Sequence, residues 1–319
     1  MQSFPIAAPA RESWSTFHPL TARDRALMTA LRAQVAPNKG RLRGPAARAP
    51  FDAIIGRTIA PEGVRFRDGR VGGITGWWCE PADVLPGAAI LHLHGGWFNW
   101  GSSAAFRHLV GHIARSAGAR AFIAEYRLAP EHPFPAAIED AAASLRGLPE
   151  HGIRRIAVTG DSAGGNLALS LLSLTSAAQV TGAHLVSAAV FSPVTDLALT
   201  GSSWQSRADA DPYFVREQVE GLVQAYLKGH DPRDPKASPL HASFSGSPPI
   251  RVHVGDDEVL LADSDRVVER AVAAGVDARL DVWEGMPHGF VGGVGRLEAA
   301  AGALKAIGGF LSSRLAPGT

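Results

Sequence analysis

The sequence predicts an α/β protein with a mostly parallel sheet, and two patterns support this fold class. From about residue 51, short apolar stretches with strand character alternate with longer helical stretches, which is typical of a parallel α/β sheet. Several strand stretches are continuously apolar, such as Ala88–Leu91 and Ser187–Phe191, and such runs suit strands that helices cover on both faces. With 319 residues and no linker-like segment, the chain is long enough to bury one full core.

We expect eight strands. In chain order they are Phe51–Ile59, Gly73–Cys79, Ala88–His94, Arg120–Tyr126, Arg155–Thr159, Ser187–Phe191, Ile250–Val254 and Arg279–Trp283. Helices are expected over residues 103–117, 135–147, 165–174, 259–274 and 296–315. Because no helix separates the first two strands, we expect them to form an antiparallel hairpin at an edge of the sheet.

Two segments fall outside this alternation. Near the N-terminus, irregular residues precede a helix that Thr21 and Asp24 would open as a capping box. The segment 196–245 has a helix-like stretch, Arg216–Lys228, among Asp-Pro turns. We therefore expect residues 1–50 to supply cap helices and a loop, and residues 51–319 to form the main domain with a cap insertion at about 196–245.

Composition excludes several function classes. The net charge of +1 gives no electrostatic reason to expect a nucleic-acid partner or an anionic membrane. No apolar run approaches the length of a membrane span, and the N-terminus lacks the features of a signal peptide. Cys79 is the single cysteine, so an internal disulfide is impossible, which fits a reducing compartment. We expect a cytoplasmic protein without stable membrane insertion.

A candidate nucleophile lies in Gly160-Asp161-Ser162-Ala163-Gly164, a G-x-S-x-G match between a predicted strand and a predicted helix. Such a strand-to-helix turn holds its serine in a strained conformation with the hydroxyl exposed at the end of a sheet. Glycines on both sides remove the β-carbons that would clash there. We predict that Ser162 is a nucleophile.

A serine nucleophile needs a base and a carboxylate that orients the base, in the chain order Ser, acid, His. His288 is the preferred base, since it lies in a loop after the last strand, where active sites collect. Asp256 and Asp257 follow the seventh strand, and the residues alone do not separate them as the acid. Glu258 we expect in the first turn of the next helix, where the helix dipole favours a carboxylate.

The glycines after the third strand, in Leu93–Phe98, suit a loop whose backbone N–H groups stabilise an oxyanion. The N–H of Ala163, directly after the nucleophile, would supply another donor. His92 and His94 form an H-x-H pair, but no further cluster completes a ligand set. We therefore expect no metal site.

With these residues in place, the chain resembles the bacterial hormone-sensitive-lipase-like esterases of the α/β-hydrolase superfamily. The stretches that carry the resemblance are His94–Trp97, Glu125–Pro135, Gly160–Gly165, Gly255–Leu261 and Met286–Phe290. The resemblance covers roughly residues 50 to 315. It implies an α/β-hydrolase fold with an eight-stranded sheet and a helical cap. It also implies a serine carboxylesterase that hydrolyses short-chain esters without a cofactor.

The resemblance also implies residue roles. It makes Asp257 the acid, because Asp257-Glu258-Val259 matches the family's D-x-V step. The oxyanion donors would be the N–H groups of Gly96, Trp97 and Ala163, with His94 and Gly95 supporting the loop.

One position departs from the family pattern, since Trp97 stands where the family has glycine or alanine. The backbone N–H survives this change, but an indole must be accommodated. Either the indole narrows the substrate pocket, together with Phe98, Trp100 and Phe290, or it packs beneath the cap. Both alternatives stay open at this point.

Two other functions share these residues. A lactone, aryl-acetamide or carbamate hydrolase would use the same triad on another bond. A non-catalytic small-molecule receptor on this scaffold would lose a triad member, whereas serine, aspartate and histidine are all present here. The expected partner is a small-molecule ester, and a homodimer is possible through an edge strand near residues 279–283.

Overall fold

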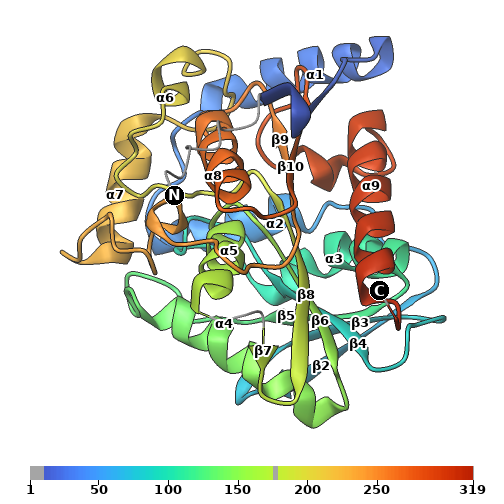
Figure 1. Ribbon diagram of the computed structural model, residues 1–319. Coiled ribbons are helices and arrows are strands. Elements are labelled where there is room, and N and C mark those ends of the chain that lie inside the picture. Colours follow the sequence, from blue (N-terminus) through green and yellow to red (C-terminus); the bar gives the residue numbers. More distant parts are fainter. Residues whose placement is uncertain (1–10, 175–178, 319) are drawn as a thin grey trace, which may run out of the picture.

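The structure is a computed structural model that describes residues 11–174 and 179–318 (Figure 1). Within these residues the sheet has ten strands in the order β1-β10-β9-β8-β6-β4-β5-β3-β2, and β7 pairs with β8 beside this path. The strands are β1 Ser15–His18, β2 Val64–Val71, β3 Ile74–Pro81, β4 Ala88–Leu93, β5 Arg120–Ala124, β6 Arg155–Asp161, β7 Gln179–Val180, β8 Ala183–Phe191, β9 Ile250–Gly255 and β10 Ala278–Trp283. Neighbouring strands in this order pair in parallel from β1 as far as β5. Beyond β5 the pairing is antiparallel, between β5 and β3 and between β3 and β2.

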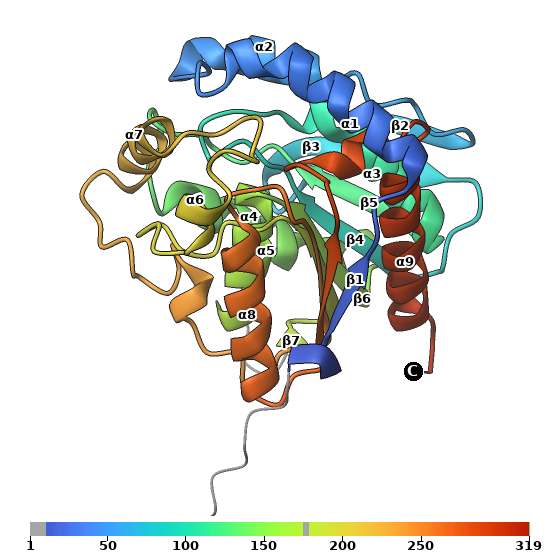
Figure 2. The same ribbon diagram turned by 90° about the horizontal axis from the view of Figure 1, so that it is seen from above.

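Helices cover both faces of the sheet, as Figure 2 shows from above. They are α1 Ala22–Val35, α2 Arg48–Ile55, α3 Ser103–Ala117, α4 Ala136–Gly147, α5 Ala163–Leu174, α6 Ser203–Ser206, α7 Arg216–Leu227, α8 Leu261–Ala273 and α9 Glu298–Leu315. In the central strand β4, Ile90 belongs to the core layer beneath α3 and α9. Its neighbour Leu91 belongs to the layer beneath α4, α5 and α8. Neighbouring residues of this buried strand thus point into different core layers, which confirms the prediction that helices cover both faces of the sheet.

One predicted strand is wrong. Residues 51–59 do not form a strand, because α2 occupies Arg48–Ile55. Phe51 and Ile55, four residues apart, both pack against the core, whereas Ile54 between them is 52% exposed, which is the spacing of a helix rather than a strand. The expected antiparallel hairpin exists, but β2 (Val64–Val71) is its first strand.

The edge expected at residues 279–283 is also wrong. The short strand β1 pairs in parallel with β10 there, with Ser15 opposite Leu280 and His18 opposite Trp283. The His18 ring stacks on the Trp283 indole at 3.9 Å between centroids. Because β1 occupies this edge, β10 does not offer the free backbone that the expected dimer contact required.

The N-terminal helices and the insertion contact each other. The Gly40 N–H donates to the Tyr213 carbonyl at 2.9 Å, and Gln218 Nε2 donates to the Leu42 carbonyl at 2.7 Å. We call these two segments, residues 21–50 and 196–245, the cap. The expected boundary at residue 50 lies within α2. The division of the chain into a cap and a main domain stays a prediction. Across the described ranges, no helix combines the length and apolar character that a membrane crossing requires.

Candidate active site

Ser162 occupies the turn between β6 and α5. Its φ of 55° lies in the left-handed region that a serine rarely adopts. Its N–H donates to the Phe191 carbonyl of β8 at 2.9 Å, which ties the turn to the neighbouring strand. A β-carbon at Gly164 would lie 1.8 Å from the Leu93 carbonyl oxygen, so only glycine fits there. The strained strand-to-helix turn predicted from the motif is confirmed.

The parallel register brings four loops to one end of the sheet. Gly160 of β6 lies opposite Val190 of β8, Phe191 lies opposite His253 of β9, and Gly255 lies opposite Trp283 of β10. The loops after these four strands therefore start side by side, as expected at the carboxyl ends of parallel strands. They carry Ser162, Ser192, the 256–258 carboxylates and His288.

The carboxylate that contacts His288 is Glu258. Its Oε2 lies 2.7 Å from His288 Nδ1. Its Oε1 accepts hydrogen bonds from the Ser192 hydroxyl at 2.7 Å and the Gly255 N–H at 2.8 Å. Glu258 is fully buried, and these three contacts hold both of its oxygens in place.

The prediction that Asp257 orients His288 is therefore wrong, and so is the alternative, Asp256. Asp257 forms an ion pair with Arg32 of α1, and Asp256 accepts the Gly285 N–H at 2.6 Å. Because α8 begins only at Leu261, Glu258 precedes the helix instead of lying in its first turn. Three consecutive carboxylates thus point in different directions, and the last of them reaches the histidine.

Burial and charge act in opposite directions on His288. Burial alone would lower its pKa, but the Glu258 carboxylate, with Asp211 and Asp161 nearby, raises the pKa above the ordinary value. The Phe214 ring meets the imidazole edge-on at 5.1 Å. His288 is therefore an imidazole whose protonated form the site stabilises, and it lies beneath an aromatic side chain of the cap.

The loop after β4 has an unusual backbone. Gly96, Trp97 and Phe98 have φ values of 121°, 52° and 60°. The Gly95 N–H donates to Asp161 Oδ1 at 3.1 Å, and the Tyr126 hydroxyl donates to the His94 carbonyl at 2.7 Å. These contacts fix the loop beside the Ser162 turn.

Backbone N–H groups beside Ser162 are available to a bound oxygen. Among the described residues, the N–H groups of Gly96, Trp97 and Ala163 donate to no acceptor, and the same holds for Phe98 in the loop and for Gly164 and Gly165 in the first turn of α5. The first N–H groups of a helix have no intrahelical partner, and together with the loop donors they suit a negatively charged oxygen. Within the H-x-H pair, His92 Nδ1 pairs with Thr159 Oγ1 at 2.9 Å, and His94 Nδ1 pairs with the Gly95 carbonyl at 2.9 Å.

The Trp97 indole packs beneath the cap. It is 1% exposed and contacts Phe214 edge-on at 5.5 Å and Trp204 at 6.3 Å between centroids. Since Phe214 also contacts His288, a single aromatic side chain separates Trp97 from the imidazole.

The other three pocket candidates pack elsewhere. Phe98 stacks on Tyr226 of α7, Trp100 donates through Nε1 to the Gly44 carbonyl, and Phe290 packs against Trp283. Their contacts favour a role in packing over substrate contact. Phe214 was not among the sequence candidates, because an aromatic residue in an insertion carries no local signal of what it covers.

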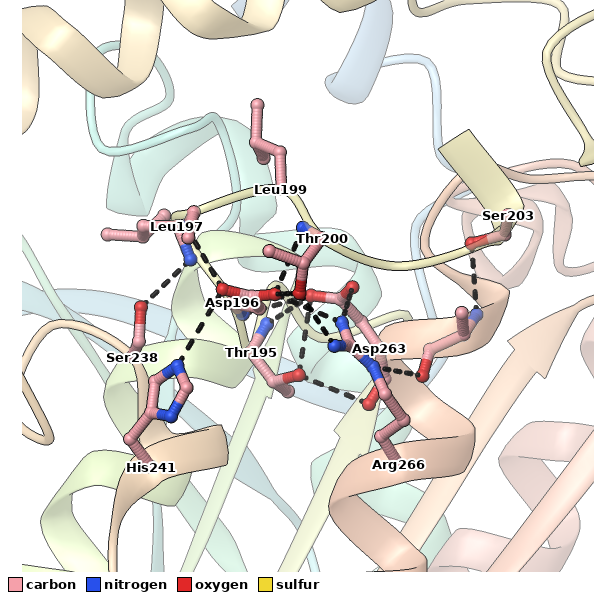
Figure 3. Close-up of polar contacts among 12 residues, drawn as sticks. Thr195, Asp196, Leu197, Leu199, Thr200, Ser203, Ser238, His241, Asp263 and Arg266 are labelled. Atoms are coloured by element: carbon pink, nitrogen blue, oxygen red, sulfur yellow. Dashed lines mark hydrogen bonds and ion pairs between the residues drawn. The ribbon is translucent and has the colours of Figure 1, made fainter. Parts of the chain in front are cut away.

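A buried polar cluster joins the start of the insertion to α8 (Figure 3). Asp263 Oδ2 accepts the N–H groups of Thr195 and Asp196 at 2.7 and 3.0 Å. Arg266 Nη2 lies 3.2 Å from a carboxylate oxygen of Asp196 and 3.2 Å from one of Asp263. Burial raises the pKa of Asp263 to about 6. This cluster connects the cap to the helix that follows Glu258.

We expect Asp263→Ala to destabilise the protein by about 2–4 kcal/mol, because the Thr195 and Asp196 N–H groups would be buried without an acceptor. The loss is measurable as a change in the free energy of unfolding in urea. Glu269→Ala on the exposed face of the same helix is the matched control, and its effect should stay within about 0.5 kcal/mol. Equal stability of both variants would contradict the anchoring role of the cluster.

Comparisons with known proteins identify the family of this fold. A family model described as alpha/beta hydrolase fold matches residues 90–292. An acetyl-hydrolase of Streptomyces hygroscopicus is 39% identical over 221 residues, 68% of this chain and 73% of the relative. The carboxylesterase NlhH of Mycobacterium tuberculosis is 33% identical over 263 residues, 78% of this chain and 79% of the relative.

Among solved structures, an esterase from the bacterial hormone-sensitive lipase family superposes with a TM-score of 0.84 at 34% identity, covering 93% of this chain and 99% of that one. The esterase EstE5 superposes with a TM-score of 0.84 at 33% identity, covering 90% and 98%. The chain therefore belongs to the alpha/beta hydrolase family and, within it, to the bacterial hormone-sensitive-lipase-like esterases.

Proposed function

We propose that this carboxylic ester hydrolase works through Ser162 as nucleophile, His288 as base and Glu258 as the carboxylate that orients the base. The 2.7 Å contact between His288 Nδ1 and Glu258 Oε2 carries the proposal. It leaves Nε2 of the imidazole as the atom that exchanges the serine proton. This assignment replaces Asp257 by Glu258 and retains the other two residues.

In the proposed cycle, His288 removes the Ser162 proton as the oxygen attacks the ester carbonyl. The N–H groups of Gly96, Trp97 and Ala163 bind the resulting oxyanion. When the carbon–oxygen bond to the alcohol breaks, the imidazolium returns its proton to the alcohol. Water, deprotonated by His288, then attacks the acyl-enzyme. The carboxylic acid leaves, and the imidazolium returns the proton to the Ser162 oxygen, which regenerates the free serine and the neutral imidazole.

The preferred substrates in this proposal are small-molecule esters with short acyl chains. Phe214 contacts both His288 and Trp97, and Trp97 contacts Trp204. We infer that these aromatic side chains limit the length of the acyl chain. Relatives named acetyl-hydrolase and ethyl acetate hydrolase support a short acyl group. The single, buried Cys79 suits the cytoplasm as the place of action.

Covalent labelling tests the proposal. Diethyl p-nitrophenyl phosphate should phosphorylate the protein once, at Ser162, with parallel loss of p-nitrophenyl acetate hydrolysis, as mass spectrometry and absorbance can follow. Acetanilide, γ-butyrolactone and an aryl carbamate, assayed beside the ester, distinguish the related hydrolases, and we expect the ester to have the highest kcat/KM. Turnover that survives complete labelling of Ser162 would contradict the mechanism, and absence of turnover would favour a receptor.

A further inference from the structure

The backbone next to Glu258 is held by the cap. The Val259 N–H donates to Asp211 Oδ2 at 3.0 Å, and the Val259 carbonyl accepts the Ser203 hydroxyl. Ser203 Oγ also accepts the Ala262 N–H at 3.1 Å. Both polar groups of the residue that follows the proposed acid therefore depend on side chains of the insertion.

Asp211 has a second set of contacts. Its Oδ1 accepts the N–H groups of Tyr213 and Phe214 at 2.8 and 3.0 Å, and its side chain is fully buried. These bonds set the turn that places the Phe214 ring on His288. The Asp211 carboxylate thus holds both the loop that carries Glu258 and the Phe214 ring that covers His288.

An amide of the same shape would not make these contacts. Three N–H groups converge on the two oxygens of Asp211, whereas asparagine offers one oxygen and turns two further donors toward the remaining N–H. Burying a charge is costly unless it is paired or hydrogen-bonded, and burial indeed raises the pKa of Asp211. A carboxylate is the side chain of this size that satisfies all three donors.

We propose that Asp211 is a positioning residue for catalysis. It holds the Glu258–His288 pair through Val259 and Phe214, and it adds a negative charge that faces the imidazole. This inference rests on the proposed function, because it concerns the acid and base of the same site. It makes a correctly placed cap a condition for an aligned triad.

Asp211→Asn tests the inference. We expect kcat/KM for p-nitrophenyl acetate to fall about 10- to 100-fold, because small displacements of catalytic groups have effects of this size. The charged groups that face His288 are Glu258, Asp211 and Asp161. Removing one negative charge lowers the pKa of His288, so the acidic limb of the pH profile should move to lower pH.

Two further variants separate alignment from charge. Asp231→Asn is the matched control, since Asp231 also precedes a proline and its Oδ1 accepts the N–H two residues later, but at an exposed turn. It should change neither kcat/KM nor the acidic limb. Ser203→Ala releases the Val259 carbonyl without altering charge, and we expect a lower kcat/KM with the acidic limb unmoved.

An NMR titration of the His288 ring needs no substrate, so it separates this inference from the proposed function. A lower pKa of His288 in Asp211→Asn than in the unmodified chain supports the inference even if no ester is hydrolysed. An unchanged pKa together with an unchanged kcat/KM in the folded variant overturns it. Should Asp211→Asn not fold, undiminished kcat/KM in Ser203→Ala overturns the link through Val259.

Discussion

Ser162→Ala is expected to lower kcat/KM for p-nitrophenyl butyrate by at least about 10³-fold, because loss of a triad nucleophile removes most of the catalysis. Alanine tolerates the φ of 55° at this position about as poorly as serine does, so the turn carries the same strain in both chains. The N–H donors of the oxyanion position stay in place, and the activity that remains reports their contribution. Initial rates over a range of substrate concentrations measure the effect.

A second serine provides the control for this change. Ser173 lies on the same helix, α5, and its hydroxyl donates to the Ser170 carbonyl at 2.8 Å within that helix. Ser173→Ala should leave kcat/KM within about twofold, since it removes one local hydrogen bond far along the helix from the turn. Full activity in Ser162→Ala would show that another group attacks the ester.

The strained turn that carries the proposed nucleophile could be predicted from the sequence because its requirements are local. A strand, a tight turn with glycines and a helix all lie within residues 155–174, and each has its own signature in the sequence. The predicted helices that pack on the sheet were likewise confirmed, since their apolar spacing reports the face that they bury.

The carboxylate that contacts His288 could not be predicted in this way, because distant segments decide which of the three faces the histidine. Arg32, 225 residues earlier in the chain, binds Asp257, and Asp211, 48 residues earlier, binds the Val259 N–H. The same holds for β1, a four-residue strand whose pairing partner β10 lies at the other end of the chain. Such non-local contacts leave no periodic pattern in the segment itself.

The order of effects at the three consecutive carboxylates is the sharpest test of the revised triad. Glu258→Gln is expected to lower kcat/KM by about 10³- to 10⁴-fold, because the buried partner of a catalytic histidine fixes its tautomer and orientation. Asp257→Asn removes an ion pair with Arg32 in which both side chains are about a quarter exposed or more. Such pairs contribute roughly 1 kcal/mol or less, so kcat/KM should change only a few-fold. Asp256→Asn, which keeps an oxygen for the Gly285 N–H, should behave similarly.

The pH dependence of kcat/KM provides a second measurement for this test. The Glu258 charge raises the pKa of His288, so Glu258→Gln lowers that pKa, and the acidic limb should move to lower pH while the plateau falls. Simple unfolding would lower the plateau without moving the limb of the surviving fraction. If Asp257→Asn abolished turnover while Glu258→Gln retained it, the side chain that contacts His288 in the structure would not be the one that supports catalysis. In that case the loop after β9 would have to rearrange when substrate binds, with Arg32 releasing Asp257.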